Sequence, residues 1–492
     1  MNRRTLLTRT TMATACICWP RLAEGAELQS SALGNIFTQG QTPVFTLRAD
    51  GGKAHWRVRD FFGGDVASGD APLSGGAANF RPAIQKLGYF KLDIALDGGA
   101  TIETALAILP QPEAPSGNSP FGVVTHFAKD WPTDIIPLIG KAGLGRIRDE
   151  QPWRKVEKDL GRYQFPPRLR DYMGKLAAEK IDPLIVLAFS NPLYDNDKTP
   201  FDESGRAGFA AYASAVAQRY RGQLAAVEVW NEYSGSFCDG PCRTDRPAYY
   251  AAMLKETYKS LKAINPSLTV AGGAAVPIPL DYFDGLFRHG ALDAMDAIVI
   301  HPYRKSPEGV EDKIEALRHM MQRYGAVKPI WATEFGDTAD MHKNRDDVAR
   351  YLVRMSTLLL AGGCERIYWY LLKDYQEFSG MGLLLSESDS AGRYVPTPAY
   401  AAYAVLIKQL GGARFVRREP SEPELRVYLF SKAGREIRVA WSTQGAKTYG
   451  LQGAGGLQQM DMMGNATTIP TRDGQARVSL DANPVYLMRP AS

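Results

Sequence analysis

Eight short apolar runs recur through the middle of this chain, and Ala-rich stretches with a helical pattern separate them. Strand followed by helix, repeated eight times, is typical of a (β/α)8 barrel. An open doubly wound sheet would require a Gly-rich nucleotide loop after the first run, and Phe121–His126 offers none. The predicted fold class is therefore α/β, a TIM barrel. Its candidate strands are Gly122–His126, Leu144–Asp149, Pro183–Phe189, Ala225–Asn231, Leu268–Gly272, Ala297–His301, Pro329–Glu334 and Arg366–Leu371.

The segments that flank this repeat follow a different pattern. Short runs such as Tyr89–Leu96 and Leu425–Phe430 alternate apolar and polar residues between Gly and Asp turns, which is typical of antiparallel β-sandwiches. A stretch rich in Pro, Gly and Ser, Gln111–Pro120, reads as a linker. We expect an N-terminal β-sandwich at residues 27–115, the barrel at 116–412 and a C-terminal β domain at 413–492.

The first 26 residues resemble an export signal. Arg3 and Arg4 precede Thr-Leu-Leu, a modestly apolar stretch follows to Trp19, and small residues lie at Ala23–Ala26. The adjacent arginines resemble a twin-arginine signal, and a general secretory signal is the alternative, since Arg9 interrupts the apolar stretch. Both alternatives predict a periplasmic or secreted protein.

Charge and hydropathy limit the classes of partner that this chain is expected to bind. Loss of residues 1–26 removes four arginines and one glutamate, which lowers the formal net charge from +5 to +2. A nearly neutral protein is not expected to bind nucleic acid or an anionic membrane surface. No segment after residue 26 has eighteen uninterrupted apolar residues, so we expect no membrane span. We further expect a monomer.

Two of the five cysteines, Cys238 and Cys242, lie close together in a loop that also contains Gly240 and Pro241. In an exported protein this spacing favours a disulfide. A redox or metal-binding pair is the alternative, but no second Cys/His pair completes a tetrahedral site, and the six histidines show no paired ligand spacing. We therefore predict neither a metal nor a cofactor.

Polar residues close several of the predicted strands. In a (β/α)8 barrel the carboxyl ends of the strands meet at one face, and active sites lie there. A single polar residue after a strand is usually a solvated loop residue, but so many at one edge indicate a site. They are His126, Arg148, Asp149, Asn191, Asn231, Glu232, His301, Tyr303 and Glu334.

Two of these residues are glutamates that end β-prone runs, Val227–Glu232 and Pro329–Glu334. Two carboxylates are the minimum equipment for the cleavage of a glycosidic bond. Arg148, near the same edge, is placed to keep Glu334 ionised by supplying an opposite charge.

The alternation of side chains along a strand makes a further prediction. If Glu232 faces the barrel axis, then Trp230 and Glu228 share its side. Glu228 would lie one layer deeper, where an unpaired charge is costly, so we expect it to pair with Arg146 or Arg148.

These residues also carry a family resemblance. Trp230–Glu232 after the fourth strand and Glu334–Gly336 after the seventh resemble the acid/base and nucleophile motifs of clan A retaining glycoside hydrolases. Further motifs narrow the resemblance to glycoside hydrolase family 39 and the related exopolysaccharide endoglycosidases of bacterial biofilm loci, over residues 119–405. These motifs are Trp153–Glu157, Gly161–Phe165, His301–Tyr303 and Pro396–Tyr400.

The resemblance implies individual roles. Glu232 is then the acid/base, protonated at working pH, and Glu334 the nucleophile. Asn231 is expected to bind the 2-hydroxyl of the attacked sugar, where hydrogen bonds strengthen in the transition state. Tyr303 is expected to donate to the nucleophile and His301 to bind a sugar hydroxyl.

The remaining substrate-binding residues are predicted from aromatic side chains and strand ends. Trp369 resembles the clan's tryptophan below the attacked sugar, although the run Tyr368–Tyr370 must also point aromatic rings at the helices. Trp153 and Tyr194 are candidate outer platforms for sugar rings. His126, Arg148 and Asn191 complete the predicted set.

Substrate preference does not transfer from the family, because Tyr233–Phe237 replaces the common Pro-Asn after Glu232. Long rim loops favour an open groove, so we expect an endo-acting retaining β-glycosidase that cleaves a bacterial or plant polysaccharide. An exo-acting β-xylosidase-like enzyme is one alternative. A non-catalytic carbohydrate-binding barrel is another, against which the retention of both carboxylates argues. The terminal β domains are expected to have structural roles, with carbohydrate binding as the alternative.

Overall fold

The computed structural model describes residues 25–97, 99–113, 119–336, 344–375, 378–452 and 456–489. Residues 1–24 of the predicted export signal lie outside the described part of the chain, as do residues 114–118 of the predicted linker.

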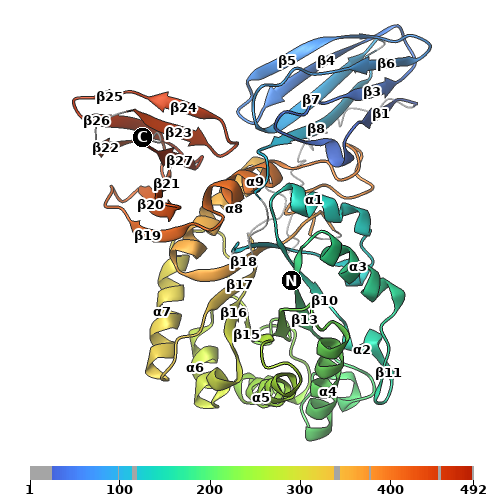
Figure 1. Cartoon of the computed structure of the whole chain (residues 1–492), viewed down its shortest axis with the longest axis vertical. Coiled ribbons are helices and arrows are strands. Elements are labelled where there is room, and N and C mark those ends of the chain that lie inside the picture. Colours follow the sequence, from blue (N-terminus) through green and yellow to red (C-terminus); the bar gives the residue numbers. More distant parts are fainter. Residues whose placement is uncertain are drawn as a thin grey trace, which may run out of the picture.

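Eight parallel strands form a closed barrel in the middle of the chain, as the sequence predicts (Figure 1). Neighbouring strands follow chain order, and the last pairs with the first through Tyr368 and Gly122. Each strand overlaps its predicted run, with ends that differ by a few residues. The strands are β9 (Phe121–Val124), β10 (Arg146–Glu150), β13 (Asp182–Leu187), β14 (Ala226–Val229), β15 (Thr269–Ala275), β16 (Ala297–Ile300), β17 (Ile330–Phe335) and β18 (Cys364–Trp369).

A helix follows each barrel strand, so helices surround the barrel (Figure 1). The short helix α2 (Trp153–Val156) and the hairpin of β11 (Glu157–Asp159) and β12 (Arg162–Tyr163) are inserted after β10. The eight barrel helices are α1 (Ile136–Lys141), α3 (Pro167–Ala178), α4 (Glu203–Arg219), α5 (Arg246–Ile264), α6 (Leu280–Arg288), α7 (Val310–Arg323), α8 (Arg345–Ala361) and α9 (Pro398–Leu410).

Three of these helices begin at a residue whose side chain caps the first turn. Asp202 accepts from the backbone N–H of Gly205 at the start of α4, and Asp245 accepts from Ala248 at the start of α5. Asn344 caps α8 in the same manner. The cap satisfies an N–H group that has no partner within the helix, which fixes where each connection ends and each helix starts.

The barrel strands are buried on both faces, since one face fills the barrel and the other packs on the helices. All four residues of β14 and of β16 are buried. The residues of β16 are Ala, Ile, Val and Ile, whereas β14 places the charged Glu228 inside the barrel. A charge at that depth requires a partner, which the site supplies.

Two sheets pack on each other in the N-terminal region, around a core that includes Phe45, Trp56, Phe80 and Leu92. Strand β7 alternates buried and less buried residues along its length, the pattern of a sheet with one face in the core. The three-stranded sheet consists of β1 (Glu27–Ser30), β3 (Phe45–Arg48) and β6 (Ala77–Phe80). The five-stranded sheet consists of β2 (Ile36–Thr38), β8 (Thr101–Leu109), β7 (Gly88–Leu96), β4 (Lys53–Asp60) and β5 (Asp65–Pro72).

Two further sheets form the C-terminal region, around Val427, Tyr449, Val478 and Leu487. The six-stranded sheet consists of β19 (Arg414–Arg418), β20 (Leu425–Lys432), β21 (Arg435–Ser442), β27 (Val485–Met488), β23 (Leu457–Asp461) and β24 (Ala466–Ile469). The three-stranded sheet consists of β22 (Lys447–Gln452), β26 (Gln475–Leu480) and β25 (Thr471–Arg472).

Both sheet-rich regions lie on one side of the barrel, next to α8 and α9 (Figure 1). The backbone N–H of Leu87 donates to Oδ1 of Asn465 at 2.9 Å, which joins the two regions. Trp441 donates from Nε1 to Oε1 of Glu308 at 3.0 Å, which joins the C-terminal sheets to the barrel. The domain limits at residues 27–115, 116–412 and 413–492 stay a prediction.

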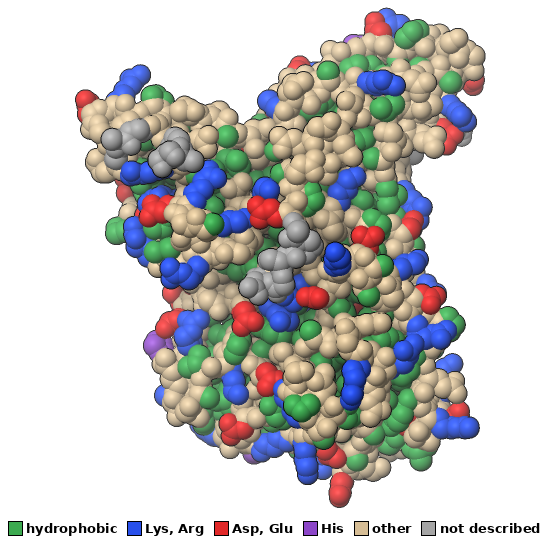
Figure 2. Space-filling view, viewed as in Figure 1, with side chains coloured by type: hydrophobic (Ala, Val, Ile, Leu, Met, Phe, Trp, Pro, Cys, Tyr) green, Lys and Arg blue, Asp and Glu red, His purple; other side chains and the backbone are tan. Residues whose placement is uncertain are grey.

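The surface carries both signs of charge. Positive and negative side chains are interspersed over the face shown in Figure 2. Within the described part of the chain, none of the helices combines the length and the apolar character that crossing a bilayer requires.

Candidate active site

Arg148 connects the acidic residues inside the barrel. Its guanidinium donates to both oxygens of Glu228, at 2.9 Å from Nε and 2.7 Å from Nη2. Nη2 also donates to Oδ1 of Asn231 at 2.7 Å, and Nη1 donates to Oε1 of Glu334. The predicted pairing of Glu228 with Arg148 is thus confirmed. Burial alone would raise the pKa of Glu228, but the opposing charge of Arg148 outweighs it and lowers the pKa to about 2.

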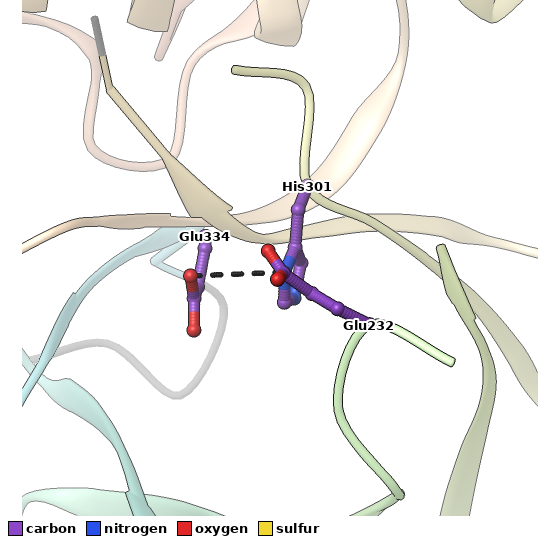
Figure 3. A group of neighbouring side chains, drawn as sticks. All are labelled: Glu232, His301 and Glu334. Atoms are coloured by element: carbon purple, nitrogen blue, oxygen red, sulfur yellow. Dashed lines mark hydrogen bonds and ion pairs between the residues drawn. The ribbon is translucent and has the colours of Figure 1, made fainter. Parts of the chain in front are cut away.

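The carboxylates of Glu232 and Glu334 converge at the carboxyl ends of β14 and β17 (Figure 3). One oxygen of each carboxylate and a ring nitrogen of His301 all lie within 4.8 Å of one another. The side chain of Glu232 is 16% exposed and that of Glu334 is 10% exposed, so both reach the open end of the barrel. Two carboxylates at this separation can act on the two sides of a single bond.

Tyr303 gives Glu334 a second donor. Its Oη donates to Oε2 of Glu334 at 2.8 Å, while Arg148 contacts the other oxygen. Burial and then the charge of Glu334 raise the pKa of Tyr303 well above its ordinary value, so its hydroxyl keeps its proton. Both oxygens of Glu334 therefore accept hydrogen bonds, and the predicted donation from Tyr303 is confirmed.

His301 lies between the two glutamates and is fully buried. Nδ1 is 3.0 Å from Oε1 of Glu232, and Nε2 is 3.0 Å from Oγ1 of Thr333. Because both ring nitrogens already face protein groups, the prediction that His301 binds a sugar hydroxyl is wrong. In this structure its Nδ1 contacts the carboxylate of Glu232 instead.

The charge of His301 follows from its neighbours. Burial lowers the pKa of this imidazole, but the carboxylates of Glu334, Glu228 and Glu232 outweigh burial and raise the pKa to about 9. His301 is then protonated at neutral pH and donates from both nitrogens. Glu232, His301 and Glu334 are close enough together to hold a metal ion. The two ring nitrogens of His301 already face Glu232 and Thr333, an arrangement that suits proton transfer.

The eighth strand shows a second correction. Trp369 is fully buried, its ring packs edge-on against Phe335 at 5.4 Å, and its Nε1 donates to the carbonyl of Met381. The prediction that Trp369 lies below the attacked sugar is therefore wrong. The next residue, Tyr370, lies at the site instead, because its ring is 6.2 Å from that of Tyr303. The sequence run contains both rings, and only the point where β18 ends distinguishes them.

The motif after the second strand is structural. Trp153 is fully buried, stacks on Tyr194 at 4.9 Å, and donates from Nε1 to Glu157 at 2.6 Å. Tyr194 also donates to Glu157, at 2.9 Å. The amide of Asn191 donates to the carbonyl of Glu157 and accepts from a backbone N–H two residues further on. The predicted substrate contacts of the buried Trp153 and Asn191 are therefore wrong, whereas the platform role of the partly buried Tyr194 stays a prediction.

Glu157 is the residue that sequence reasoning missed in this motif. It is 1% exposed and accepts hydrogen bonds from two aromatic side chains and from the backbone of Gly161. Its position four residues after Trp153 was visible in the sequence, and a one-turn spacing of acid and aromatic residue is the signal for such a contact.

His126 lies at the edge of the site, where its Nε2 is 3.3 Å from Oη of Tyr370. Burial, and then the nearby charges of Lys129, Arg148 and Lys373, lower its pKa to about 3. It is therefore a neutral polar group at neutral pH.

The fourth strand ends earlier than predicted, at Val229. The backbone of Trp230 and of Glu232 then adopts positive φ angles of 66° and 41°. The strict alternation of a strand stops there, so the ring of Trp230 packs on Phe189 and on Phe209 of α4. The prediction that Trp230 faces the barrel axis beside Glu232 is therefore wrong.

The predicted disulfide is present between Cys238 and Cys242. It closes the loop that follows Glu232. Cys364 is the free cysteine among the described residues, and it is buried.

A closed eight-stranded α/β barrel with two facing glutamates at the carboxyl ends of its strands has the arrangement that cleavage of a glycosidic bond requires. Residues 248–397 match the family model described as the glycosyl hydrolase catalytic core. The matched segment contains His301, Tyr303 and Glu334, whereas Glu232 precedes it. None of the curated proteins is similar enough in sequence to count as a relative.

Solved structures share this fold. A family 39 glycoside hydrolase from the gut symbiont Bacteroides cellulosilyticus WH2 has a TM-score of 0.79 at 21% identity, covering 94% of this chain and all of its own. A family 30 endoxylanase from Clostridium papyrosolvens C71 has a TM-score of 0.55 at 15% identity, covering 76% and 98%. A monomeric β-xylosidase from Caulobacter crescentus CB15 has a TM-score of 0.53 at 16% identity, covering 78% and 98%. The predicted resemblance to clan A glycoside hydrolases is confirmed in fold.

Proposed function

We propose that this glycoside hydrolase is a retaining β-glycosidase, with Glu334 as nucleophile and Glu232 as acid/base. The observation that carries the proposal is the approach of the two carboxylates to within 4.8 Å. Retaining enzymes hold their carboxyl groups roughly 5 to 5.5 Å apart, whereas inverting enzymes need about 6.5 to 9.5 Å to admit a water molecule.

The environment of each glutamate supports its role. Arg148 and Tyr303 donate to the two oxygens of Glu334 and fix their direction, as a nucleophile requires. In the first step an oxygen of Glu334 attacks the anomeric carbon and the glycosidic C–O bond breaks. Glu232 gives its proton to the departing oxygen, so the leaving sugar departs as a neutral alcohol.

The second step reverses these roles. Glu232, now a carboxylate, removes a proton from water, and the water oxygen attacks the anomeric carbon and releases Glu334. His301 stabilises the carboxylate of Glu232 in this state, because its protonated Nδ1 lies 3.0 Å from Oε1. Arg148 holds Oδ1 of Asn231 at 2.7 Å, which orients the amide for the contact with the 2-hydroxyl that the resemblance implies.

For the substrate we propose a β-linked bacterial or plant polysaccharide that is cleaved within the chain. Two insertions at the carboxyl ends of the strands support an open groove: the β11–β12 hairpin after β10 and the disulfide loop after β14. Xylan is a first candidate, because one protein of similar fold is named an endoxylanase. An exo-acting enzyme is the second candidate, because another is named a β-xylosidase.

We also propose that the protein acts outside the cytoplasm, in the periplasm or as a secreted enzyme. The disulfide between Cys238 and Cys242 supports this location, because such bonds persist in oxidising compartments.

A panel of xylan, other plant β-glycans and bacterial exopolysaccharides tests the proposal, with product size followed over time. Endo action predicts a series of oligosaccharides at early times, and exo action predicts a single small sugar. The matched variant Glu334→Gln should bind the polysaccharide that the wild-type protein cleaves, without cleaving it. The contrary result is that the wild-type protein cleaves no polysaccharide of the panel but binds one of them as tightly as Glu334→Gln does. The protein would then be a carbohydrate-binding barrel.

A further inference from the structure

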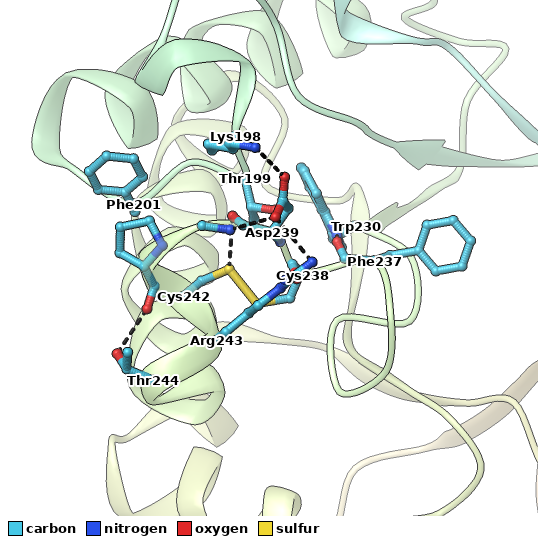
Figure 4. Close-up of a disulfide and its surroundings, with 12 residues drawn as sticks. Lys198, Thr199, Phe201, Trp230, Phe237, Cys238, Asp239, Cys242, Arg243 and Thr244 are labelled. Atoms are coloured by element: carbon cyan, nitrogen blue, oxygen red, sulfur yellow. Dashed lines mark hydrogen bonds and ion pairs between the residues drawn. A yellow bond between two sulfur atoms is a disulfide. The ribbon is translucent and has the colours of Figure 1, made fainter.

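The loop that follows Glu232 exposes an aromatic ring. Phe237 is 43% exposed, and it lies directly before the Cys238–Cys242 disulfide (Figure 4). One side of its ring is covered by Phe189, at a centroid distance of 5.4 Å and an interplanar angle of 23°. Phe189 in turn meets the ring of Trp230 edge-on, at 5.7 Å and 82°. Phe237 is thus the exposed end of a supported stack of rings.

The backbone at Phe237 is fixed on both sides. Trp230 donates from Nε1 to the carbonyl of Phe237 at 2.9 Å (Figure 4). On the other side, Arg243 donates from Nε to the carbonyl of Cys238 at 2.9 Å, and the disulfide closes this loop. A ring that is held before a ligand arrives loses little conformational freedom on binding.

The position of the stack relates it to the candidate site. Phe189 and Phe237 follow the carboxyl ends of the neighbouring strands β13 and β14, the edge at which Glu232 lies. Five residues of extended chain span at most about 18 Å. The loop is more compact than that, because the N–H of Gly235 turns back to the carbonyl of Glu232 at 2.9 Å. Phe237 therefore lies within about 18 Å of Glu232, the residue that protonates the leaving group in the proposed mechanism.

We propose that Phe237, backed by Phe189, is a stacking platform for a sugar ring in the leaving-group part of the substrate. This inference rests on the proposed function and extends it, because it gives the protein a binding site beyond the cleaved bond. The face of an aromatic ring is electron-rich, and the C–H groups on the face of a pyranose are slightly positive. A β-linked chain presents such faces at each ring.

A single exposed ring suits a sugar better than a protein partner. The apolar surface described here is the exposed ring of Phe237 with the partly buried Phe189, whereas protein interfaces use broad apolar patches.

Two substrates derived from the polysaccharide that the wild-type protein cleaves distinguish binding at Phe237 from the chemical step. A tetrasaccharide of this polysaccharide has sugars on the leaving-group side of the cleaved bond. In the corresponding glycosyl fluoride, fluoride replaces these sugars. For xylan these are xylotetraose and β-xylobiosyl fluoride. The measured quantity is the ratio of kcat/KM for the tetrasaccharide to kcat/KM for the fluoride.

Phe237→Ala should lower this ratio about tenfold, and Phe237→Trp should keep it within about twofold of wild type. The control Phe62→Ala removes a 52% exposed phenylalanine between β4 and β5, in the N-terminal sheets, and should leave the ratio unchanged. An unchanged ratio in Phe237→Ala, or an equal fall for both substrates, overturns the platform. A wild-type protein that cleaves nothing in the panel contradicts the proposed function instead.

Discussion

Arg148 and Glu334 form an ion pair across the barrel, although 186 positions separate them in the chain. The same guanidinium binds Glu228 through two hydrogen bonds. One buried cation therefore neutralises a deep carboxylate and also holds the proposed nucleophile.

Glu228→Gln should destabilise the fold by about 3 kcal/mol, because it leaves a buried guanidinium with less compensating charge. Chemical denaturation at pH 7 measures this change. The control Asp70→Asn removes an exposed ion pair with Lys53 and should change stability by less than about 0.5 kcal/mol. Equal effects of the two variants would show that the pair with Arg148 contributes no more than a surface contact.

The low pKa of Glu228 also predicts a pH dependence. Its folded-state pKa of about 2 lies below the ordinary value near 4.5, so the stability it contributes is present above that value. This stability is lost as the pH falls from about 4.5 toward 2. The difference in unfolding free energy between wild type and Glu228→Gln should shrink over this range. A difference independent of pH there would contradict the ion pair.

The raised pKa of His301 predicts a loss of stability at alkaline pH. Its folded-state pKa of about 9 lies above the ordinary value of about 6.5, so its contribution to stability is fully present below pH 6.5. It is lost as the pH rises through 9. The stability of wild type relative to His301→Gln should fall by up to about 3 kcal/mol between these pH values. A difference between wild type and His301→Gln that does not change with pH would rule out the charged imidazole.

Tyr303→Phe should lower kcat about 10- to 100-fold, because it removes a hydrogen bond to the charged Glu334. Stability should change little by comparison. Tyr324→Phe is the matched control, since it removes a 2.8 Å hydrogen bond to Asp284 on the outer helices. Steady-state kinetics of both variants on one substrate provide the comparison, and equal rates would argue against a role for Tyr303.

The neighbours Trp369 and Tyr370 should differ in effect. Trp369→Phe should cost about 2 kcal/mol of stability, with kcat/KM within about threefold of wild type, because the ring is part of the core. Tyr370→Ala should lower kcat/KM at least about tenfold, because this ring lies beside Tyr303. The reverse pattern would restore Trp369 to the site.

Sequence reasoning located the strands and the two glutamates because buried parallel strands are marked by local pattern, an apolar run that ends in a polar residue. The predictions failed where they extended the in-and-out alternation of side chains beyond the end of a strand. Trp230 has a positive φ and turns outward, and Tyr370 rather than Trp369 lies beside Tyr303. The prediction that Trp153 binds substrate failed for another reason. A tryptophan that donates to Glu157 and one that binds a sugar have the same local sequence.

The configuration of the first-formed product tests the central claim most directly. Proton NMR recorded during the first minutes of cleavage distinguishes the two anomers before they equilibrate in water. The account predicts a β-anomer from a β-linked substrate, because Glu334 and Glu232 stand close enough for two successive displacements. An initial α-anomer would contradict it.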